Sequence, residues 1–225
     1  MKKIEVLSVE NSQLLTDDLW LSYLLQIPKN QQKKVEKFHF QKDKQASLLG
    51  KLLLKNVLEI YFVNTSLNDI KYTKYQKPYF EEDFSFNISH SGDYVVLAYS
   101  LCNSLLGIDI EKINENLQIE GFNSILTFEE KEYIKNSKYP YKTFYDTWTI
   151  KEALSKADGR GLGIPFKDIK INQDYVSIDQ TKWFSKSVEI ASNYRCHVVS
   201  NHIFTINHNQ VELQDLYKSI SPVFS

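Results

Sequence analysis

The chain has 225 residues, of which 42% are hydrophobic and 24% charged, and its 27 basic residues nearly balance its 28 acidic ones. This composition supports a packed core and excludes the strong positive field of a dedicated nucleic-acid binder. With no apolar run of roughly 18 residues, no signal-peptide core and only two cysteines, we expect a cytoplasmic protein without a membrane partner, a disulfide scaffold or a cysteine-based zinc site.

The first part of the chain has the pattern of one strand and two helices. Residues 2–8 can form a strand, residues 30–40 (NQQKKVEKFHF) a short basic helix, and a longer apolar helix follows Asp43. Gly50 lies inside the longer helix, where glycine costs about 1 kcal/mol relative to alanine. We therefore expect a close packing contact at Gly50.

Three strand patterns follow one another in the middle of the chain. FSFNIS (84–89) alternates apolar and polar residues and ends in a turn at residues 90–93. YVVLAYS (94–100) provides a return strand, and LGIDIE (106–111) comes after a short connection. This order predicts a three-stranded meander.

The second half begins with helices and ends with β-rich segments. Thr127 and Glu130 have the spacing of a capping box, and residues 143–157 read as a helix that stops at Gly159. After Pro165 the segments KIN, VSI, SVEIA, CHVVS and IFTIN suggest a second sheet. No linker rich in Pro, Gly or Ser separates the halves, so two lobes would share an interface.

Two carboxylates point to the same side of the LGIDIE strand. Because successive side chains of a strand face opposite ways, Asp109 and Glu111 project together while Ile108 and Ile110 face away. Neighbouring carboxylates repel each other unless they are solvated or a cation lies between them. A solvated sheet face and an ion site are both consistent with this pattern.

A helix after this strand adds a third acid. Glu152 and Lys156 are spaced by four and lie on one stripe, where they could also form a surface pair worth about 0.2–0.5 kcal/mol. Together with Asp109 and Glu111, Glu152 makes a set of oxygen ligands that suits Mg²⁺, a cation that shares its shell readily with phosphate. The lack of a Cys or His cluster argues against zinc.

Ser89 and His90 end the strand of an adjacent hairpin. A hydroxyl and an imidazole there could donate hydrogen bonds to phosphate oxygens, although a histidine at a turn is commonly a solvated or capping residue. Lys77 precedes Pro78, which favours an extended chain at that point.

Three stretches together resemble the 4′-phosphopantetheinyl transferases of the surfactin-synthetase-activating type: FNISHSG (86–92), LGIDIE (106–111) and WTIKEALSK (148–156). KPYF (77–80) and the basic helix before SLLG (47–50) fit the same picture, so the resemblance covers residues about 30 to 165. It implies an α+β fold, a monomer of two similar α/β lobes related by a pseudo-twofold axis. The expected lobes are residues 1–104 and 105–225, with coenzyme A in the cleft between them.

The resemblance also implies roles for individual residues. Asp109, Glu111 and Glu152 match magnesium ligands, Ser89 and His90 match phosphate contacts, Lys77 and Pro78 match the segment beside the adenine, and Lys34 matches a basic residue around the 3′-phosphate. Lys156 matches the pyrophosphate-binding lysine and joins Glu152 and Glu130 in the expected catalytic set.

Two features limit the transfer of these roles. Glu130 falls where the family has a carboxylate proposed as general base, but a carboxylate engaged in a capping box is less free to accept a proton. Gln31 and Ala46 stand where basic residues are expected, so the 3′-phosphate pocket is less basic unless Lys33 or Lys44 substitutes.

The expected reaction is Mg²⁺-dependent transfer of the 4′-phosphopantetheine arm of coenzyme A to a serine of an apo acyl or peptidyl carrier protein, with release of adenosine 3′,5′-bisphosphate. One alternative is a Mg²⁺-dependent hydrolase of coenzyme A or a related pyrophosphate, which needs no protein acceptor. Another is a coenzyme A-binding module without metal-dependent turnover. The client pathway stays open among fatty-acid, polyketide and nonribosomal-peptide synthesis.

Overall fold

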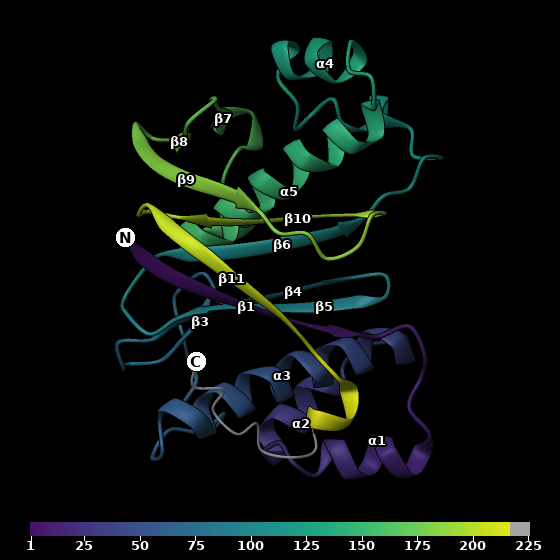
Figure 1. The fold of residues 1–225 in the computed structure, drawn as a ribbon, viewed down its shortest axis with the longest axis vertical. Helices are drawn as coiled ribbons and strands as arrows, with labels where there is room; N and C mark the ends of the chain where they lie inside the picture. Colours follow the sequence, from purple (N-terminus) through teal and green to yellow (C-terminus); the bar gives the residue numbers. More distant parts are fainter. Residues whose placement is uncertain (217–225) are drawn as a thin grey trace.

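Two β-sheets with a shared core lie between helices in the computed structural model of the chain, which describes residues 1–216 (Figure 1). The strands are β1 (Lys2–Glu10), β2 (Lys71–Tyr72), β3 (Pro78–Tyr79), β4 (Ser85–Ser91), β5 (Tyr94–Ser100), β6 (Leu106–Lys112), β7 (Lys170–Ile171), β8 (Val176–Ile178), β9 (Thr181–Ser187), β10 (Tyr194–Ser200) and β11 (Phe204–Val211). The helices are α1 (Asp17–Leu24), α2 (Lys29–Val35), α3 (Gln41–Tyr61), α4 (Phe128–Lys135) and α5 (Pro140–Asp158).

The strands form two main sheets and a small hairpin. The first sheet has the order β11-β1-β5-β4, the second has the order β6-β10-β9-β8-β7, and β2 pairs with β3. This arrangement confirms the predicted α+β class, while the pseudo-twofold relation between lobes stays a prediction. No helix within residues 1–216 combines the length and apolar character needed to cross a bilayer.

The predicted elements are largely present, and two differences concern which segments form helices and strands. Helix α1 has no counterpart in the sequence-based prediction. The second sheet predicted after Pro165 is present, but the SVEIA segment does not form its own strand, because β9 occupies residues 181–187 and ends at Ser187. The Trp183 side chain, which is 2% exposed, points into the core from β9.

Helix α3 covers the outer face of the first sheet. Its apolar stripe is completely buried, as the helical spacing of its leucines predicts. A Cβ atom at Gly50 would lie 2.9 Å from Ile88 Cγ2 and 3.5 Å from Val95 Cγ1. The close packing contact predicted at Gly50 is therefore confirmed, and it sets how closely α3 approaches β4 and β5.

Helix α5 lies in direct contact with β6. A Cβ atom at Gly107 would lie 2.1 Å from the carbonyl oxygen of Ala153 and 2.5 Å from the amide nitrogen of Ala157. Ala153 and Ala157 are both completely buried. Glycine on the strand and alanines on the helix thus let the two backbones approach each other. This approach places the acids of β6 beside α5, which carries Glu152 and Lys156.

The shared core lies between the two sheets. Ile108 and Ile110 of β6 are completely buried there, against Val96 and Ala98 of β5. This confirms that the two isoleucines face away from the acids of β6. Strands β1, β10 and β11 contribute further members, namely Ile4, Val6, Cys196, Val198 and Phe204.

The predicted meander is wrong in its third strand. Strands β4 and β5 pair as a hairpin, but β6 pairs with β10 and belongs to the second sheet. Strand β6 instead meets β4 through side chains: Asn87 Oδ1 accepts a hydrogen bond from the Ile108 amide at 2.9 Å. The polar residues that alternate along β4 therefore join the two sheets.

The chain returns to its starting sheet near its end. Strand β11 pairs in parallel with β1, with Lys2 opposite Phe204 and Val9 opposite Val211. A division at residue 104 would place β11 with the second half, yet it lies in the first sheet. The division itself stays a prediction.

Candidate functional site

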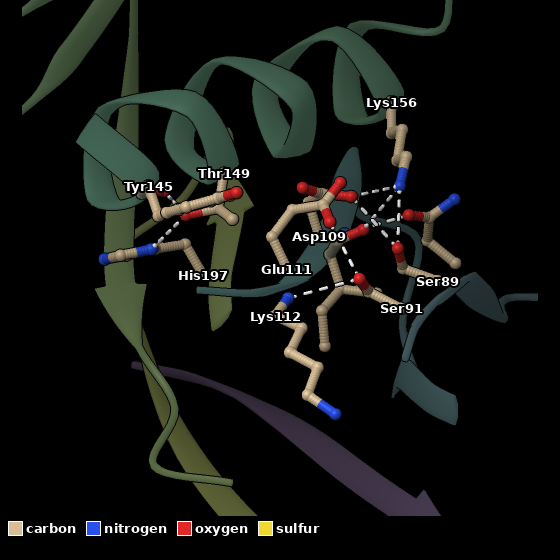
Figure 2. Close-up of polar contacts among 11 residues, drawn as sticks. Ser89, Ser91, Asp109, Glu111, Lys112, Tyr145, Thr149, Lys156 and His197 are labelled. Carbon is tan, nitrogen blue, oxygen red and sulfur yellow. Dashed lines mark hydrogen bonds and ion pairs between the residues drawn. The ribbon is translucent and has the colours of Figure 1, made fainter. Parts of the chain in front are cut away.

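Asp109, Glu111 and Lys156 lie close together where β6, α5 and β4 meet (Figure 2), and Glu152 of α5 acts on them through its charge. The Lys156 Nζ atom donates to Asp109 Oδ1 at 2.6 Å and to Ser89 Oγ at 3.0 Å. Ser89 Oγ in turn donates to the same carboxylate oxygen at 3.0 Å. Asp109 is only 4% exposed, so this lysine and this serine largely compensate its buried charge.

The three carboxylates act on one another electrostatically. Burial raises the pKa of Asp109, and the neighbouring Lys156 opposes that rise. Burial and the charge of Asp109 raise the pKa of Glu111, which accepts a hydrogen bond from Ser91 Oγ at 2.8 Å. Burial, followed by the charge of Asp109, raises the pKa of Glu152 to about 7. The site thus holds more negative charge than its one lysine neutralises.

One oxygen of this site has no protein partner. Asp109 Oδ2 is buried and accepts no hydrogen bond from any described residue, although its other oxygen accepts two. A buried polar atom of this kind is costly, so it calls for a ligand. An unpartnered carboxylate oxygen beside two mutually repelling glutamates is the donor chemistry that Mg²⁺ prefers.

The side chains do not form a ready metal cage. Within residues 1–216, no group of three or more His, Cys, Asp or Glu side chains is arranged to hold a metal ion. The carboxylates are neighbours, but Lys156 is the cation that contacts Asp109 here. The donor types fit Mg²⁺, and the magnesium site stays a prediction.

His90 lies on the opposite side of β4 from Ser89. Partial burial lowers its pKa, and the charges of Asp43, Lys156 and Asp109 also act on it. Because side chains alternate along a strand, His90 shares the face of β4 on which Ile88 approaches Gly50 of α3, and it lies near enough to the acid site for Asp109 and Lys156 to act on it.

Lys77 joins the two halves of the molecule. Its Nζ atom donates to the carbonyl oxygens of Ala157 at 2.7 Å and Leu106 at 3.2 Å. Burial lowers its pKa to about 8. A cavity of about 540 Å³ opens beside it, lined in part by Pro78 and Gly159. Lys77 and Pro78 thus border a space that could hold a ligand, while the ammonium group satisfies one carbonyl at the end of α5 and one at the start of β6.

The positions predicted around a 3′-phosphate separate into two groups. Lys34 of α2 donates to the hydroxyl of Tyr72, and its ammonium lies 4.0 Å from the centre of that ring. Gln31 is 3% exposed and donates to the Leu67 carbonyl at 3.1 Å, and Ala46 is 3% exposed in the core. Gln31 and Ala46 therefore face the core.

The two basic residues named as substitutes lie on different helices, and whether either of them substitutes stays a prediction. Lys44 forms an ion pair with Glu36 at 2.8 Å, and Lys33 is exposed on α2.

Glu130 caps its own helix, and it also neutralises a buried lysine. The Thr127 amide donates to Glu130 Oε2 at 2.9 Å, and the Glu130 amide donates to Thr127 Oγ1 at 3.2 Å, which confirms the capping box. Lys151 Nζ, whose side chain is 0% exposed, donates to the same Oε2 atom at 2.7 Å. These contacts favour the capping interpretation, and the role of general base stays untested.

Sequence reasoning did not identify the polar residues that β10 places opposite the acids. Arg195 lies opposite Glu111 and His197 opposite Asp109. His197 Nδ1 is 2.8 Å from Thr149 Oγ1 of α5, and burial lowers the pKa of His197 to about 3 (Figure 2). The alternation of RCHV could have indicated that Arg195 and His197 share a face, but it could not reveal their register with β6.

Comparisons with known proteins match most of the chain. Residues 15–102 match the family described as 4′-phosphopantetheinyl transferase, N-terminal, and residues 105–206 match the 4′-phosphopantetheinyl transferase superfamily. The chain is 40% identical over 149 residues to the 4′-phosphopantetheinyl transferase gsp of Aneurinibacillus migulanus, a match that covers 63% of this chain and 57% of that protein.

Two relatives from Bacillus subtilis match over more of their own length. The 4′-phosphopantetheinyl transferase ffp is 31% identical over 180 residues, which cover 72% of this chain and 76% of the relative. The 4′-phosphopantetheinyl transferase Sfp of strain 168 is 29% identical over 191 residues, which cover 78% of this chain and 83% of the relative.

Proposed function

Because this chain belongs to the 4′-phosphopantetheinyl transferase superfamily, we propose that it transfers the 4′-phosphopantetheine arm of coenzyme A to a serine of an acyl or peptidyl carrier protein. The observation that supports this most directly is the site where Lys156, Ser89 and Asp109 form a buried network with a carboxylate oxygen left unpartnered. Lysine and serine side chains can donate hydrogen bonds to the oxygens of a pyrophosphate, and carboxylates are the usual ligands of a divalent ion.

The reaction is a displacement at phosphorus. The carrier serine Oγ forms a bond to the phosphorus next to the pantetheine arm, and the bond from that phosphorus to the bridging oxygen breaks. Adenosine 3′,5′-bisphosphate leaves with the electron pair, and the serine proton passes to a base. Positioning and charge neutralisation supply most of the acceleration in such reactions.

The residues of this chain divide the remaining tasks. Asp109, Glu111 and Glu152 would hold Mg²⁺, which supplies positive charge to the pyrophosphate. Lys156 sits between β4 and β6 with its ammonium already desolvated on one side, so it can bind phosphate oxygens and neutralise charge that develops on the leaving group. Ser89 can donate to a phosphate oxygen once it releases Asp109, and His90 lies close enough to this site to act on the same charge.

A base must accept the proton of the carrier serine. Glu130 was the sequence-based candidate, yet its carboxylate already accepts bonds from Thr127 and Lys151. We retain it as a candidate because those contacts can be tested by mutation.

The test is mass spectrometry of apo carrier proteins after incubation with this protein, coenzyme A and Mg²⁺. A mass gain equal to the phosphopantetheine arm on the carrier serine, with equimolar adenosine 3′,5′-bisphosphate, is the expected result. Consumption of coenzyme A in the absence of any carrier would instead establish the hydrolase alternative. Binding of coenzyme A without turnover in either case would leave only a binding module.

A further inference from the structure

Strand β10 holds helix α5 through two polar contacts. His197 Nδ1 lies 2.8 Å from Thr149 Oγ1, and Arg195 Nε donates to Asp146 Oδ1 at 2.5 Å. The first contact is buried, since His197 is 6% exposed and Thr149 is 0% exposed, whereas Asp146 is partly exposed. Water therefore competes little with the contact between His197 and Thr149, which makes it the better defined of the two.

The hydrogen bond between His197 and Thr149 has a fixed direction (Figure 2). A hydroxyl has one hydrogen, and the Thr149 hydroxyl donates it to the carbonyl oxygen of Tyr145 at 2.7 Å. Thr149 Oγ1 therefore accepts from the Nδ1–H group of His197. The histidine is thus a donor that connects the second sheet to the backbone of α5 through one hydroxyl.

The two contacts of β10 lie directly across the sheet from the acids of the candidate site. His197 is opposite Asp109, and Arg195 is opposite Glu111. Residues directly opposite each other on antiparallel strands point to the same face, so all four side chains lie on the face of the sheet that carries α5. The strand pair that presents the acids therefore also holds the helix that carries Glu152.

The acids oppose a close approach of α5 to β6. Burial raises the pKa of Glu152 to about 7, and the charges of Asp109 and Glu111 add to the rise, which reflects repulsion among the three carboxylates. The contact at Gly107 limits how closely the helix approaches but does not fix its position along its axis. A hydrogen bond can fix that position, because it weakens steeply when its geometry changes.

We propose that His197 is a positioning residue for Glu152: by donating to Thr149, it fixes the position of α5 along β10 and so places the Glu152 carboxylate beside Asp109. Thr149 and Glu152 are three residues apart and therefore neighbours on the helix surface. A slide by one residue corresponds to about 1.5 Å along the axis, which exceeds the misplacement of about 1 Å that impairs a catalytic site. This inference rests on the proposed function, in which Glu152 helps to hold a divalent ion.

The decisive experiment is a double-mutant cycle between His197 and Glu152. Electron paramagnetic resonance measures Mn²⁺ binding by the wild type, His197→Leu, Glu152→Gln and the double variant, because Mn²⁺ is paramagnetic and takes the oxygen ligands that suit Mg²⁺. We expect His197→Leu to bind Mn²⁺ about 10-fold more weakly, the lower end of the cost of losing a residue that orients a metal ligand.

The double variant distinguishes positioning from general damage. Asp109 and Glu111 lie on β6, so a shift of α5 misplaces only Glu152 among the three acids. In the Glu152→Gln background, His197→Leu should therefore weaken Mn²⁺ binding further by less than about 2-fold, the usual error of additivity. A residue that merely supported the fold would cause the same loss in both backgrounds.

Two further comparisons control for the loss of a histidine. His208→Leu is the matched control, because the His208 ring lies 2.8 Å from Ser8 Oγ in the first sheet, and it should bind Mn²⁺ as the wild type does. Thr149→Val removes the acceptor hydroxyl and should reproduce the loss of His197→Leu, whereas Thr149→Ser keeps the hydroxyl and should retain most of the affinity. If His197→Leu does not fold, as judged by circular dichroism, Thr149→Val takes its place in the cycle.

Several results would overturn the inference. They are wild-type Mn²⁺ affinity in folded His197→Leu, an equal loss in His208→Leu, equal losses in Thr149→Val and Thr149→Ser, and full additivity in the cycle. An absence of Mn²⁺ binding by the wild type would overturn it as well, because Glu152 would then hold no ion.

A transfer assay separates this inference from the proposed function. With coenzyme A, Mg²⁺ and an apo carrier protein, His197→Leu should lower kcat about 10-fold, and a higher Mg²⁺ concentration should recover part of the loss. If the wild type modifies no carrier protein, the proposed function fails, and the Mn²⁺ cycle still decides the role of His197. If the wild type is active and His197→Leu equals it in kcat and in Mn²⁺ affinity, only the inference about His197 fails.

Discussion

The contact between Gly107 and α5 predicts that a single methyl group will disturb both stability and activity. In Gly107→Ala the new Cβ would start 2.1 Å from the Ala153 carbonyl oxygen, and ordinary van der Waals contact begins at 3.4 Å, so the helix must move by about 1.3 Å. The obstacle is backbone, which cannot rotate away as a side chain can. The φ angle of Gly107 is not positive, so crowding alone accounts for the effect.

The expected cost follows from that displacement. Forcing extra volume into a packed core costs about 1–3 kcal/mol, and a protein of this size loses about 2–4 °C in Tm for each kcal/mol. Helix α5 carries Glu152 and Lys156, so its movement also changes their position relative to Asp109. A misplacement near 1 Å costs about 100-fold in catalytic rate, so we expect kcat to fall on that order.

The assay pairs thermal unfolding, followed by circular dichroism, with the rate of carrier modification measured by mass spectrometry. Gly121→Ala is the matched control, because a Cβ atom at Gly121 meets nothing within 4 Å. Wild-type Tm and wild-type activity in Gly107→Ala would refute the reasoning about helix approach. A lower Tm with unchanged activity in the folded fraction would refute the link to the site.

Three further predictions address single charges. Asp109→Ala should reduce the rate of transfer at least 100-fold and weaken its dependence on Mg²⁺. The Tm should stay within a few degrees of the wild type, because the Lys156 ammonium can be hydrated at the open side of the site. Full activity would refute the assignment of Asp109. Glu130→Gln keeps the cap but leaves Lys151 without a countercharge, which should lower the free energy of unfolding in urea by about 2–3 kcal/mol. The double variant Glu130→Gln/Lys151→Met should recover part of that loss. Reduced turnover in fully folded Glu130→Gln would favour the general-base role instead. Asp93, whose pKa its two lysine partners lower from 3.8 to about 2, should stabilise the fold above about pH 4 by up to about 1 kcal/mol relative to Asp93→Asn. The difference should shrink below about pH 4 and disappear as the pH falls through about 2, and a difference of constant size across this range would contradict the linkage.

Local sequence patterns were sufficient for the parts of the site that depend on one element. Alternation along β6 placed Asp109 and Glu111 on one face, and helical spacing placed Glu152 with Lys156. The capping box of Thr127 and Glu130 and the close contact at Gly50 were equally local. In each case the side-chain direction follows from backbone geometry within a few residues.

Features that depend on distant partners were not accessible in this way. The pattern of β6 fits a third hairpin strand as well as a first strand of another sheet, and only its pairing with β10, more than eighty residues later, distinguishes them. Lys151 looks like a solvated helix lysine by spacing, and its burial depends on Ile125 and Phe166, whose carbonyls accept from it.

The parallel pairing of β1 with β11 has a consequence for biosynthesis. Strand β1 leaves the ribosome about 200 residues before its neighbour β11, because Lys2 pairs with Phe204. During that interval one side of β1 presents unpaired amides and carbonyls, which can template association with other chains. Contacts this distant in sequence also slow folding, so the first sheet cannot be completed before β11 has been synthesised. Nascent-chain experiments should therefore find a protease-sensitive N-terminal half until the last strand has emerged.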